Sequence, residues 1–327
     1  MAQKKGKTFP LNHVMCINRA AVENMCEDSY ALSMNNDYAM IAVFDGCGGL
    51  GAKKYFNYEN HTAAYIAARA ASWATLNWFE TRMPCDQRGI NASEKQIVCS
   101  LKEALDENFG QVSRTLDKDE IKLSGSLIRS FPTTASIAII DSRKVGELKC
   151  TFLWAGDSRG FILQPDGLKQ CTKDDLRIDE DPFENLYADS PLSNIVNGEG
   201  RYNINGQRIV CKTPAIVFTA TDGTFGYLPS PMHYEWMIIR TLCTSESFTQ
   251  WEERLNEEIA SVTGDDSTLT MAVYGWKSFR ELKASFEPRE RMLRRELDHE
   301  QSIDYLRSMW QSYKTEYLLY AGNNVTE

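Results

Sequence analysis

Short apolar runs separated by polar turns recur along the chain and predict a protein built largely from β-strands. The clearest run is YAMIAVF at residues 38–44, which is expected to form a buried strand. The segment AGDSR at residues 155–159 joins two such runs and predicts a hairpin turn. Further strands are predicted at residues 13–17, 29–32, 133–140, 149–154, 160–164, 215–220 and 269–274.

Apolar residues at helical spacing predict several helices between these strands. The first covers residues 62–80, and a second begins at Ser93, where Gln96 completes a capping box. Residues 115–130 are expected to form a loop or flap. Two more helices are predicted near residues 233–243 and after a capping pair at Ser247 and Gln250. The expected buried face of the first helix carries Ile66, Ala70, Trp73, Leu76 and Phe79.

The composition becomes charged and helical from Lys277 onward. A stripe at helical spacing predicts either docking onto the rest of the chain or a surface for a protein partner. Its members are Leu306, Trp310, Tyr313 and Tyr317. We therefore expect one domain over residues 1–276, with an irregular, flap-like segment at about 174–207, and a C-terminal helical extension over residues 277–327.

Composition and charge exclude several classes of partner. The 327 residues are 43% hydrophobic and 25% charged, as in ordinary globular proteins. A formal net charge of -9 argues against nucleic acid and anionic membranes, since both would repel the protein. Nine cysteines include no CxxC pair, and no apolar run approaches the ~20 residues that span a bilayer. We expect a cytoplasmic protein with reduced thiols and no membrane partner.

Acidic residues stand at the ends of several predicted strands. Asp45, Asp222 and Asp265 each occupy one such end, and Glu27 with Asp28 precedes another strand. Adjacent strands can bring these ends together, and clustered carboxylates repel one another unless a cation neutralises them. Carboxylate and carbonyl oxygens are the ligands that Mg²⁺ and Mn²⁺ prefer. The alternative is that each acid only forms a turn, since Asp-Gly is a favoured turn pair.

Six short motifs occur in the order of a known family. They are CED at residues 26–28, VFDGCGG at 43–49, FPTTA at 131–135, AGDSR at 155–159, TDGT at 221–224 and GDDST at 264–268. In this order they resemble the type-2C family of metal-dependent protein serine/threonine phosphatases, over about residues 13–275. The resemblance implies an α+β fold, in which a central β-sandwich of two antiparallel sheets is flanked by α-helices.

The same resemblance implies a centre of two Mg²⁺ or Mn²⁺ ions. Asp45 would bridge both ions, and the carbonyl of Gly46 would bind one of them. The metal positions that the family implies are Glu27, Asp28, Asp45, Gly46, Asp222 and Asp265, with Asp157 helping to hold a weaker third ion. Water activated by the ions would then hydrolyse phosphoserine or phosphothreonine in a phosphoprotein substrate.

Two positions depart from the family. Cys47 stands where the family usually has a histidine that protonates the leaving oxygen, and a thiol is a weaker acid at neutral pH. Glu23 stands where the family has a phosphate-holding arginine, so Arg19 is the expected substitute. These departures also allow a second function: a catalytically weak or inactive phosphatase-like module that binds a phosphoprotein or a partner and acts as a regulator.

Three other kinds of site are less well supported by the sequence. The glycine run at residues 46–51 fits a dinucleotide-binding pattern, but a helical segment follows where the second strand and its acid should be. Cys47 as a phosphatase nucleophile would need an arginine six residues on, where the chain has Lys53. The four histidines show no zinc-ligand spacing.

Overall fold

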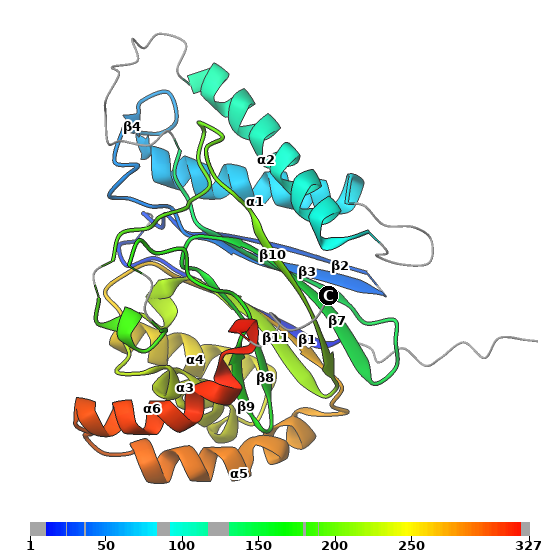
Figure 1. Cartoon of the computed structure of the whole chain (residues 1–327), viewed down its shortest axis with the longest axis vertical. Helices are drawn as coiled ribbons and strands as arrows, with labels where there is room; N and C mark the ends of the chain where they lie inside the picture. Colours follow the sequence, from blue (N-terminus) through cyan, green and yellow to red (C-terminus); the bar gives the residue numbers. More distant parts are fainter. Residues whose placement is uncertain are drawn as a thin grey trace, which may run out of the picture.

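Two antiparallel sheets of five strands each pack face to face, and helices cover the outer side of both (Figure 1). The structure is a computed structural model that describes residues 11–321, apart from 24, 36, 84–91, 117–130, 179–180 and 189. The α+β sandwich expected from the sequence is confirmed.

The strands follow the order β1-β12-β11-β8-β9 in the first sheet and β10-β7-β6-β3-β2 in the second. The first sheet comprises β1 (Leu11–Arg19), β12 (Ser267–Tyr274), β11 (Ala215–Ala220), β8 (Arg159–Gln164) and β9 (Gly167–Gln170). The second comprises β10 (Asn205–Lys212), β7 (Glu147–Ala155), β6 (Ala135–Asp141), β3 (Tyr38–Phe44) and β2 (Ser29–Met34). A separate short ribbon pairs β4 (Lys54–Tyr55) with β5 (His61–Thr62).

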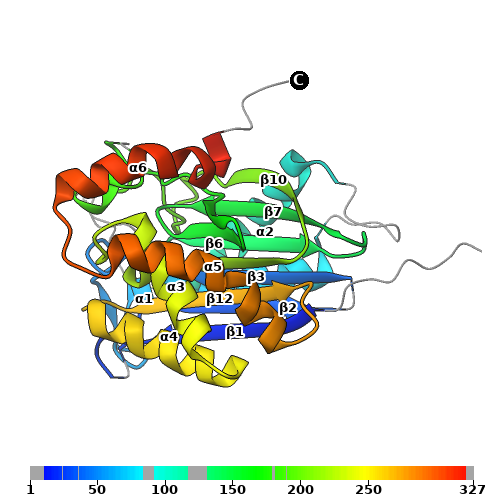
Figure 2. The ribbon, with the colours of Figure 1, turned by 90° about the horizontal axis from the view of Figure 1, so that it is seen from below.

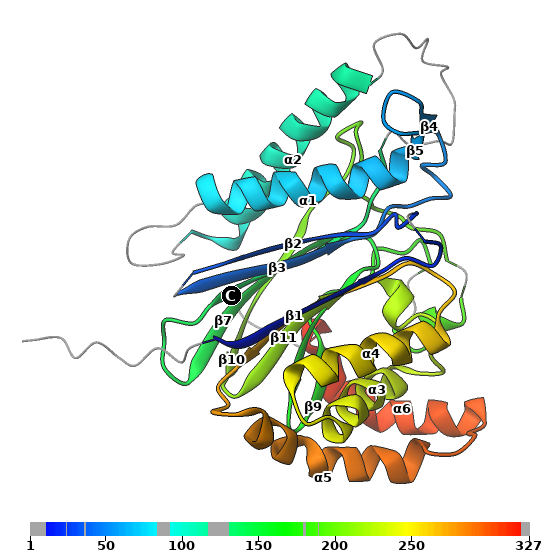
Figure 3. The ribbon, with the colours of Figure 1, turned by 180° about the vertical axis from the view of Figure 1, so that it is seen from behind.

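The helices form two outer layers. Figure 3 shows α1 (Ala63–Thr81) and α2 (Glu94–Leu116) over the second sheet. Figure 2 shows the other layer, which lies over the first sheet. It is formed by α3 (Pro231–Thr244), α4 (Phe248–Val262), α5 (Phe279–Leu297) and α6 (Ile303–Tyr317). Single 3-10 turns occur at η1 (Glu184–Leu186), η2 (Asp222–Thr224) and η3 (Leu319–Ala321).

Strand β3 is apolar throughout because both of its faces are buried. Met40, Ala42 and Phe44 pack toward the α1–α2 layer. Ala39 and Ile41 point the other way, into the core between the sheets. A strand with two buried faces needs no polar alternation, so its whole sequence is apolar.

The hairpin predicted at residues 155–159 is wrong. Strand β7 pairs with β6 and β10, whereas β8 pairs with β9 and β11, so the turn carries the chain from one sheet to the other. Gly156 adopts φ +99°, and a Cβ there would lie 2.8 Å from the side chain of Thr134. Glycine therefore allows the crossing to pass close to the start of β6.

Helix α1 occupies its predicted place, but part of its expected buried face is wrong. Trp73 is 59% exposed, whereas Trp78 is fully buried. The helix approaches the sheet through small residues such as Ala67 and Ala71, and Trp73 lies outside that face. The capping box of α2 is confirmed, since Gln96 accepts a hydrogen bond from the Ser93 amide at 2.8 Å. The first two residues of the loop expected at 115–130 belong to α2, and residues 117–130 fall outside the described residues.

The C-terminal helices pack onto the layer formed by α3 and α4. Leu306, Trp310 and Tyr317 of the predicted stripe are buried in the same core cluster as Trp251 of α4. The fourth member, Tyr313, donates a hydrogen bond to the buried carboxylate of α3 residue Glu235 at 2.6 Å. The stripe thus packs against the rest of the chain, which confirms the docking alternative for these four residues.

Candidate metal centre

The register of the strands brings the predicted acidic residues to one end of the sandwich. In the second sheet, Ser29 pairs with Phe44, so Asp28 and Asp45 extend from neighbouring strand ends. In the first sheet, Ala220 pairs with both Leu269 and Arg159, which places the segments that carry Asp222, Asp265 and Asp157 at the corresponding edge. The expected acids therefore come from both sheets.

Asp45 is held through its backbone. Its carbonyl accepts hydrogen bonds from the Thr133 hydroxyl at 2.8 Å and from the Thr134 amide at 2.8 Å. The Cys47 amide donates to the carbonyl of Pro132 at 3.2 Å. None of these bonds uses the carbonyl of Gly46, the other main-chain group expected at the centre. A Cβ on Gly46 would lie 2.6 Å from the Ala64 carbonyl oxygen, so this position requires glycine.

The more deeply buried carboxyls of the site affect one another. The Asp45 and Asp222 carboxyls lie close enough for each to affect the pKa of the other. Burial raises the pKa of both carboxyls, and nearby acids add to the effect: Asp28 acts on Asp45, and Asp265 acts on Asp222. Burial also raises the pKa of Asp157 well above its usual range, with a further contribution from Asp222.

Asp28 is 2% exposed and accepts a hydrogen bond from the Thr221 hydroxyl at 2.8 Å. Burial raises the pKa of this carboxyl to about 8, although the hydroxyls of Thr221 and Thr268 oppose the shift. At neutral pH the cluster therefore retains protons that a divalent cation would displace.

Glu27 and Asp265 lie nearer the surface. The Glu27 carboxylate accepts a hydrogen bond from the Thr62 hydroxyl, and burial raises the pKa of this carboxyl. Asp265 is exposed, and the Tyr227 hydroxyl donates to it at 3.5 Å. These two acids would face an ion from the solvent side of the cluster.

The donor chemistry of the cluster fits Mg²⁺ or Mn²⁺, because carboxylates and a backbone carbonyl are oxygen ligands. Within the described part of the chain, no three His, Cys, Asp or Glu side chains are grouped as the ligands of one ion. Asp28 and Glu27 accept hydrogen bonds from threonine hydroxyls, those of Thr221 and Thr62. The residues fit the ions in type, and binding would require carboxyls with a raised pKa to lose their protons.

Cys47 lies in the glycine turn after Asp45, and its thiol is 3.9 Å from the Asp45 carbonyl oxygen. Burial raises the pKa of this thiol well above its ordinary value, and the Asp45 carboxylate adds to the shift. A thiol in this state is neither a nucleophile nor an effective acid at neutral pH.

Arg19, the expected phosphate contact, ends β1 and lies on the same face as Met15 and Ile17, which pack toward α3 and α4. One of its guanidinium nitrogens, Nη1, is buried and has no hydrogen-bond partner among the residues that the structure describes. Arg19 pairs with Ser267, which directly follows Asp266, so its backbone lies at the same strand end as the acids of the GDDST motif.

Two residues that support the site were not predicted from the sequence. Thr62 caps α1 by accepting from the Tyr65 amide at 3.1 Å, and it also donates to Glu27. Asp266 accepts from the Glu27 amide at 2.6 Å and from the Ala21 amide at 2.8 Å. Thr62 precedes a predicted helix and Asp266 is the second acid of the GDDST motif, but the residues that they contact are far away in sequence, so the sequence did not indicate these contacts.

The irregular segment after β9 is tied to the turn that carries Asp157. Asp174 forms a buried, two-bond ion pair with Arg159, with distances of 2.9 Å from Nε and 2.6 Å from Nη2. The next residue, Asp175, accepts from the Gly156 amide at 3.0 Å. Farther along the segment, the Val196 carbonyl accepts from the Thr133 amide at 3.0 Å. This segment therefore contacts the turn that carries Asp157 and also Thr133, which donates to the Asp45 carbonyl.

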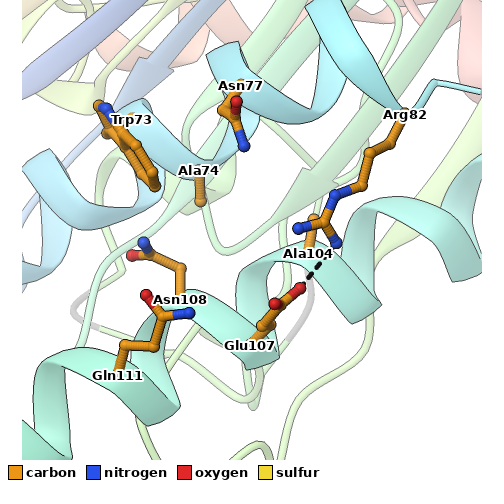
Figure 4. A pocket seen from close by; sticks show the side chains of 8 residues that line it. All are labelled: Trp73, Ala74, Asn77, Arg82, Ala104, Glu107, Asn108 and Gln111. Carbon is orange, nitrogen blue, oxygen red and sulfur yellow. Dashed lines mark hydrogen bonds and ion pairs between the residues drawn. The ribbon is translucent and has the colours of Figure 1, made fainter.

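A small pocket lies elsewhere, between α1 and α2 (Figure 4). Trp73, Asn77 and Asn108 contribute to its lining, and the ion pair of Arg82 with Glu107 lies across it at 2.7 Å. It holds about 60 Å³, well below the ~300 Å³ of a typical ligand site, and we assign it no role.

No helix in the described part of the chain is both long and apolar enough to cross a membrane.

No family model matches the chain, and no curated protein matches it.

Solved structures do match its fold. The serine/threonine phosphatase Stp1 of Staphylococcus aureus is 12% identical, with a TM-score of 0.61 over 84% of this chain and 100% of that one. The serine/threonine phosphatase PstP of Mycobacterium tuberculosis is 18% identical, with a TM-score of 0.54 over 80% of this chain and 97% of that one.

Two further matches extend the comparison. The catalytic domain of PstP also matches as a complex with two manganese ions. A sex-determining protein of C. elegans is 15% identical, with a TM-score of 0.60 over 84% of this chain and 67% of that one. At these identities the likeness concerns the fold, and the chain has the fold of the type-2C protein serine/threonine phosphatases.

Proposed function

We propose that the protein is a metal-dependent phosphatase that hydrolyses phosphoserine and phosphothreonine in proteins. The observation that carries this proposal is the acidic cluster, in which carboxyls from both sheets interact at one end of a type-2C fold. Burying several carboxyls together is unfavourable because their negative charges repel one another, and a pair of divalent cations would offset that repulsion.

The groups that would hold two Mg²⁺ or Mn²⁺ ions are Glu27, Asp28, Asp45, the Gly46 carbonyl, Asp222 and Asp265, with Asp157 for a weaker third ion. Bound ions would lower the pKa of a water molecule and neutralise charge on the phosphoryl oxygens. The threonines around the site would fix these ligands, since Thr133 holds the backbone of Asp45 and Thr221 holds the carboxyl of Asp28. The two manganese ions of the PstP catalytic domain support a dinuclear centre.

A second candidate function is favoured by Cys47. A thiol whose pKa lies well above its ordinary value is a weak proton donor for a leaving oxygen. The protein would then be a weak or inactive phosphatase-like module that binds a phosphoprotein or a partner and acts as a regulator. In either case we propose a cytoplasmic setting, which the free thiols of the described cysteines support.

Hydrolysis of p-nitrophenyl phosphate and of a phosphothreonine peptide, with and without Mn²⁺, tests the proposal. We expect Mn²⁺-dependent turnover that falls by about 100-fold or more in Asp222→Asn, because a ligand is lost. The matched control is Asp166→Asn, since Asp166 is an exposed acid in the turn before β9 and should leave turnover unchanged. Metal binding without turnover would support the regulator.

Restoring the histidine separates the two candidates further. We expect Cys47→His to raise turnover by about tenfold or more, because a positioned general acid typically contributes ~10²–10⁴-fold. A rate equal to that of the unchanged protein would show that proton donation at this position does not limit hydrolysis.

A further inference from the structure

Arg69, on the exposed side of α1, belongs to a stack of side chains beside the acidic cluster. Its guanidinium lies 3.3 Å from the centre of the Tyr65 ring, and Tyr65 in turn stacks on His61 at 3.7 Å. Nη2 donates to the Cys26 carbonyl at 3.1 Å, and Nη1 donates to the Tyr65 carbonyl at 3.3 Å. The guanidinium is thus held on one flat face and at two of its N–H groups.

This stack adjoins the part of the cluster that faces solvent. Cys26, which Arg69 contacts, directly precedes Glu27, and the Glu27 carboxylate is bound by Thr62, the N-cap of α1. One helix therefore carries both the hydroxyl that holds an acidic residue of the cluster and a cation next to it. Arg69 is only partly buried, so a ligand that enters from solvent can meet it.

The positive charge of Arg69 is also available to a ligand. In the described part of the chain it has no carboxylate within ion-pair distance, and its two hydrogen bonds leave three of its five N–H groups. Arg159 differs, because Asp174 already neutralises it in a buried pair.

A phosphate monoester needs such a group near a site made of carboxylates. Its negative charges are repelled by those carboxylates whose charge the bound ions do not neutralise. A guanidinium attracts the phosphate and matches its oxygens with two parallel hydrogen bonds. An arginine already fixed by an aromatic face loses little freedom when it binds.

We propose that Arg69 binds the phosphate group of the substrate, and that Tyr65 and His61 hold its guanidinium in place for that contact. This inference rests on the proposed phosphatase function, because it assigns a phosphate-binding residue to the same site. Arg69 takes the role expected of Arg19 from the sequence.

Binding of inorganic phosphate, measured by titration calorimetry on the Mg²⁺-loaded protein, tests the assignment without any turnover. We expect Arg69→Ala to weaken phosphate binding by about 10- to 100-fold, the usual effect of one charged hydrogen-bonded contact. Arg69→Lys keeps the charge but loses the fork, so a smaller loss is expected. Arg82→Ala is the matched control, because it removes an arginine at the other end of α1 that is paired with Glu107.

Titration with Mg²⁺ alone distinguishes binding from a structural role. If Arg69 only supported the Cys26 carbonyl, Arg69→Ala would weaken Mg²⁺ binding and phosphate binding together, and the proposal would be overturned. It would also be overturned if Arg69→Ala bound phosphate normally, if Arg19→Ala rather than Arg69→Ala lost it, or if the unchanged protein bound no phosphate. Phosphate binding that depends on Arg69 in a protein without turnover would uphold this inference and reject the phosphatase.

Discussion

Asp266 ties the acidic loop before β2 to the strand end that carries Asp265. It accepts hydrogen bonds from the backbone amides of Ala21 and Glu27, which lie more than 200 positions away in sequence. Bonds between a carboxylate and amides are stronger than neutral ones, so they fix the backbone beside the Glu27 carboxylate. Asp266 thus acts on the candidate centre by positioning another acid.

We expect Asp266→Ala to weaken Mn²⁺ binding by about 10- to 100-fold, the range typical for residues that orient metal ligands. Asp266→Asn should lose less, because the amide oxygen still accepts one of the two bonds. Calorimetric titration with Mn²⁺ measures both variants, and Glu257→Ala, an exposed acid on α4, serves as the control. Unchanged Mn²⁺ affinity in Asp266→Ala would show that the loop is held in place by other contacts.

At the scale of elements, Glu235 joins three helices. It lies on α3 and is 0% exposed, and its carboxylate accepts bonds from Arg289 of α5 at 2.8 and 2.9 Å and from Tyr313 of α6 at 2.6 Å. The helical extension is therefore attached to the domain by a buried charge as well as by apolar packing. Breaking a buried pair leaves an uncompensated charge, which costs far more than loss of a surface pair.

We expect Glu235→Gln to lower the free energy of unfolding by about 3 kcal/mol, because Arg289 would keep its charge without a partner. Glu258→Gln is the control, since Glu258 pairs with Arg240 where both side chains are more than a third exposed, and its loss should cost less than about 1 kcal/mol. Urea unfolding measures both changes. A cost for Glu235→Gln no larger than that of the control would mean that apolar contacts alone hold the extension.

Sequence patterns predicted elements well where the cause is local and poorly where it is not. The apolar runs of β3, β11 and β12 are buried strands as predicted, because both faces of each are covered. The hairpin at residues 155–159 was wrong because two short runs and a glycine turn do not reveal which sheet each strand joins. Trp73 and Trp78 lie about 140° apart around the helix axis, and the apolar pattern alone did not indicate which of the two faces the sheet.

The same distinction between local and non-local causes applies to the residues of the candidate site. Strand ends carrying acids, such as Asp45 and Asp222, could be found from the sequence because aspartate after an apolar run is a local signal. The contacts made by Asp266 and Arg69 depend on segments that meet only in the folded chain. No spacing in the sequence indicates that Arg69 contacts the residue before Glu27.

Across the whole molecule, the candidate centre is a point where the two sheets meet. Asp45 extends from the second sheet, and Asp222 and Asp265 belong to the first, so bound ions would link the sheets. Without ions the same residues hold the sandwich together only if protons neutralise them. The stability of the whole protein should therefore depend on pH and on metal through these carboxyls.

In the metal-free protein we expect the free energy of unfolding to fall as pH rises from about 4 to about 8. The pKa of Asp28 is about 8 when folded against an ordinary value of 3.8, so between these values the folded state binds a proton that the unfolded chain has lost. Each such carboxyl contributes a slope of about 1.4 kcal/mol per pH unit, which levels off above the folded pKa.

Urea unfolding in EDTA measures this slope, and Asp28→Asn should make it shallower because one titrating group is removed. Mg²⁺ at 100 times its dissociation constant should add about 2.7 kcal/mol at pH 7 and flatten the slope, since the ions take the place of the protons. Asp222→Asn should lose most of the metal-dependent gain. A stability that rises with pH in EDTA would mean that the carboxyls at this end of the sandwich are ionised in the folded protein, so that they are not packed together as the geometry requires.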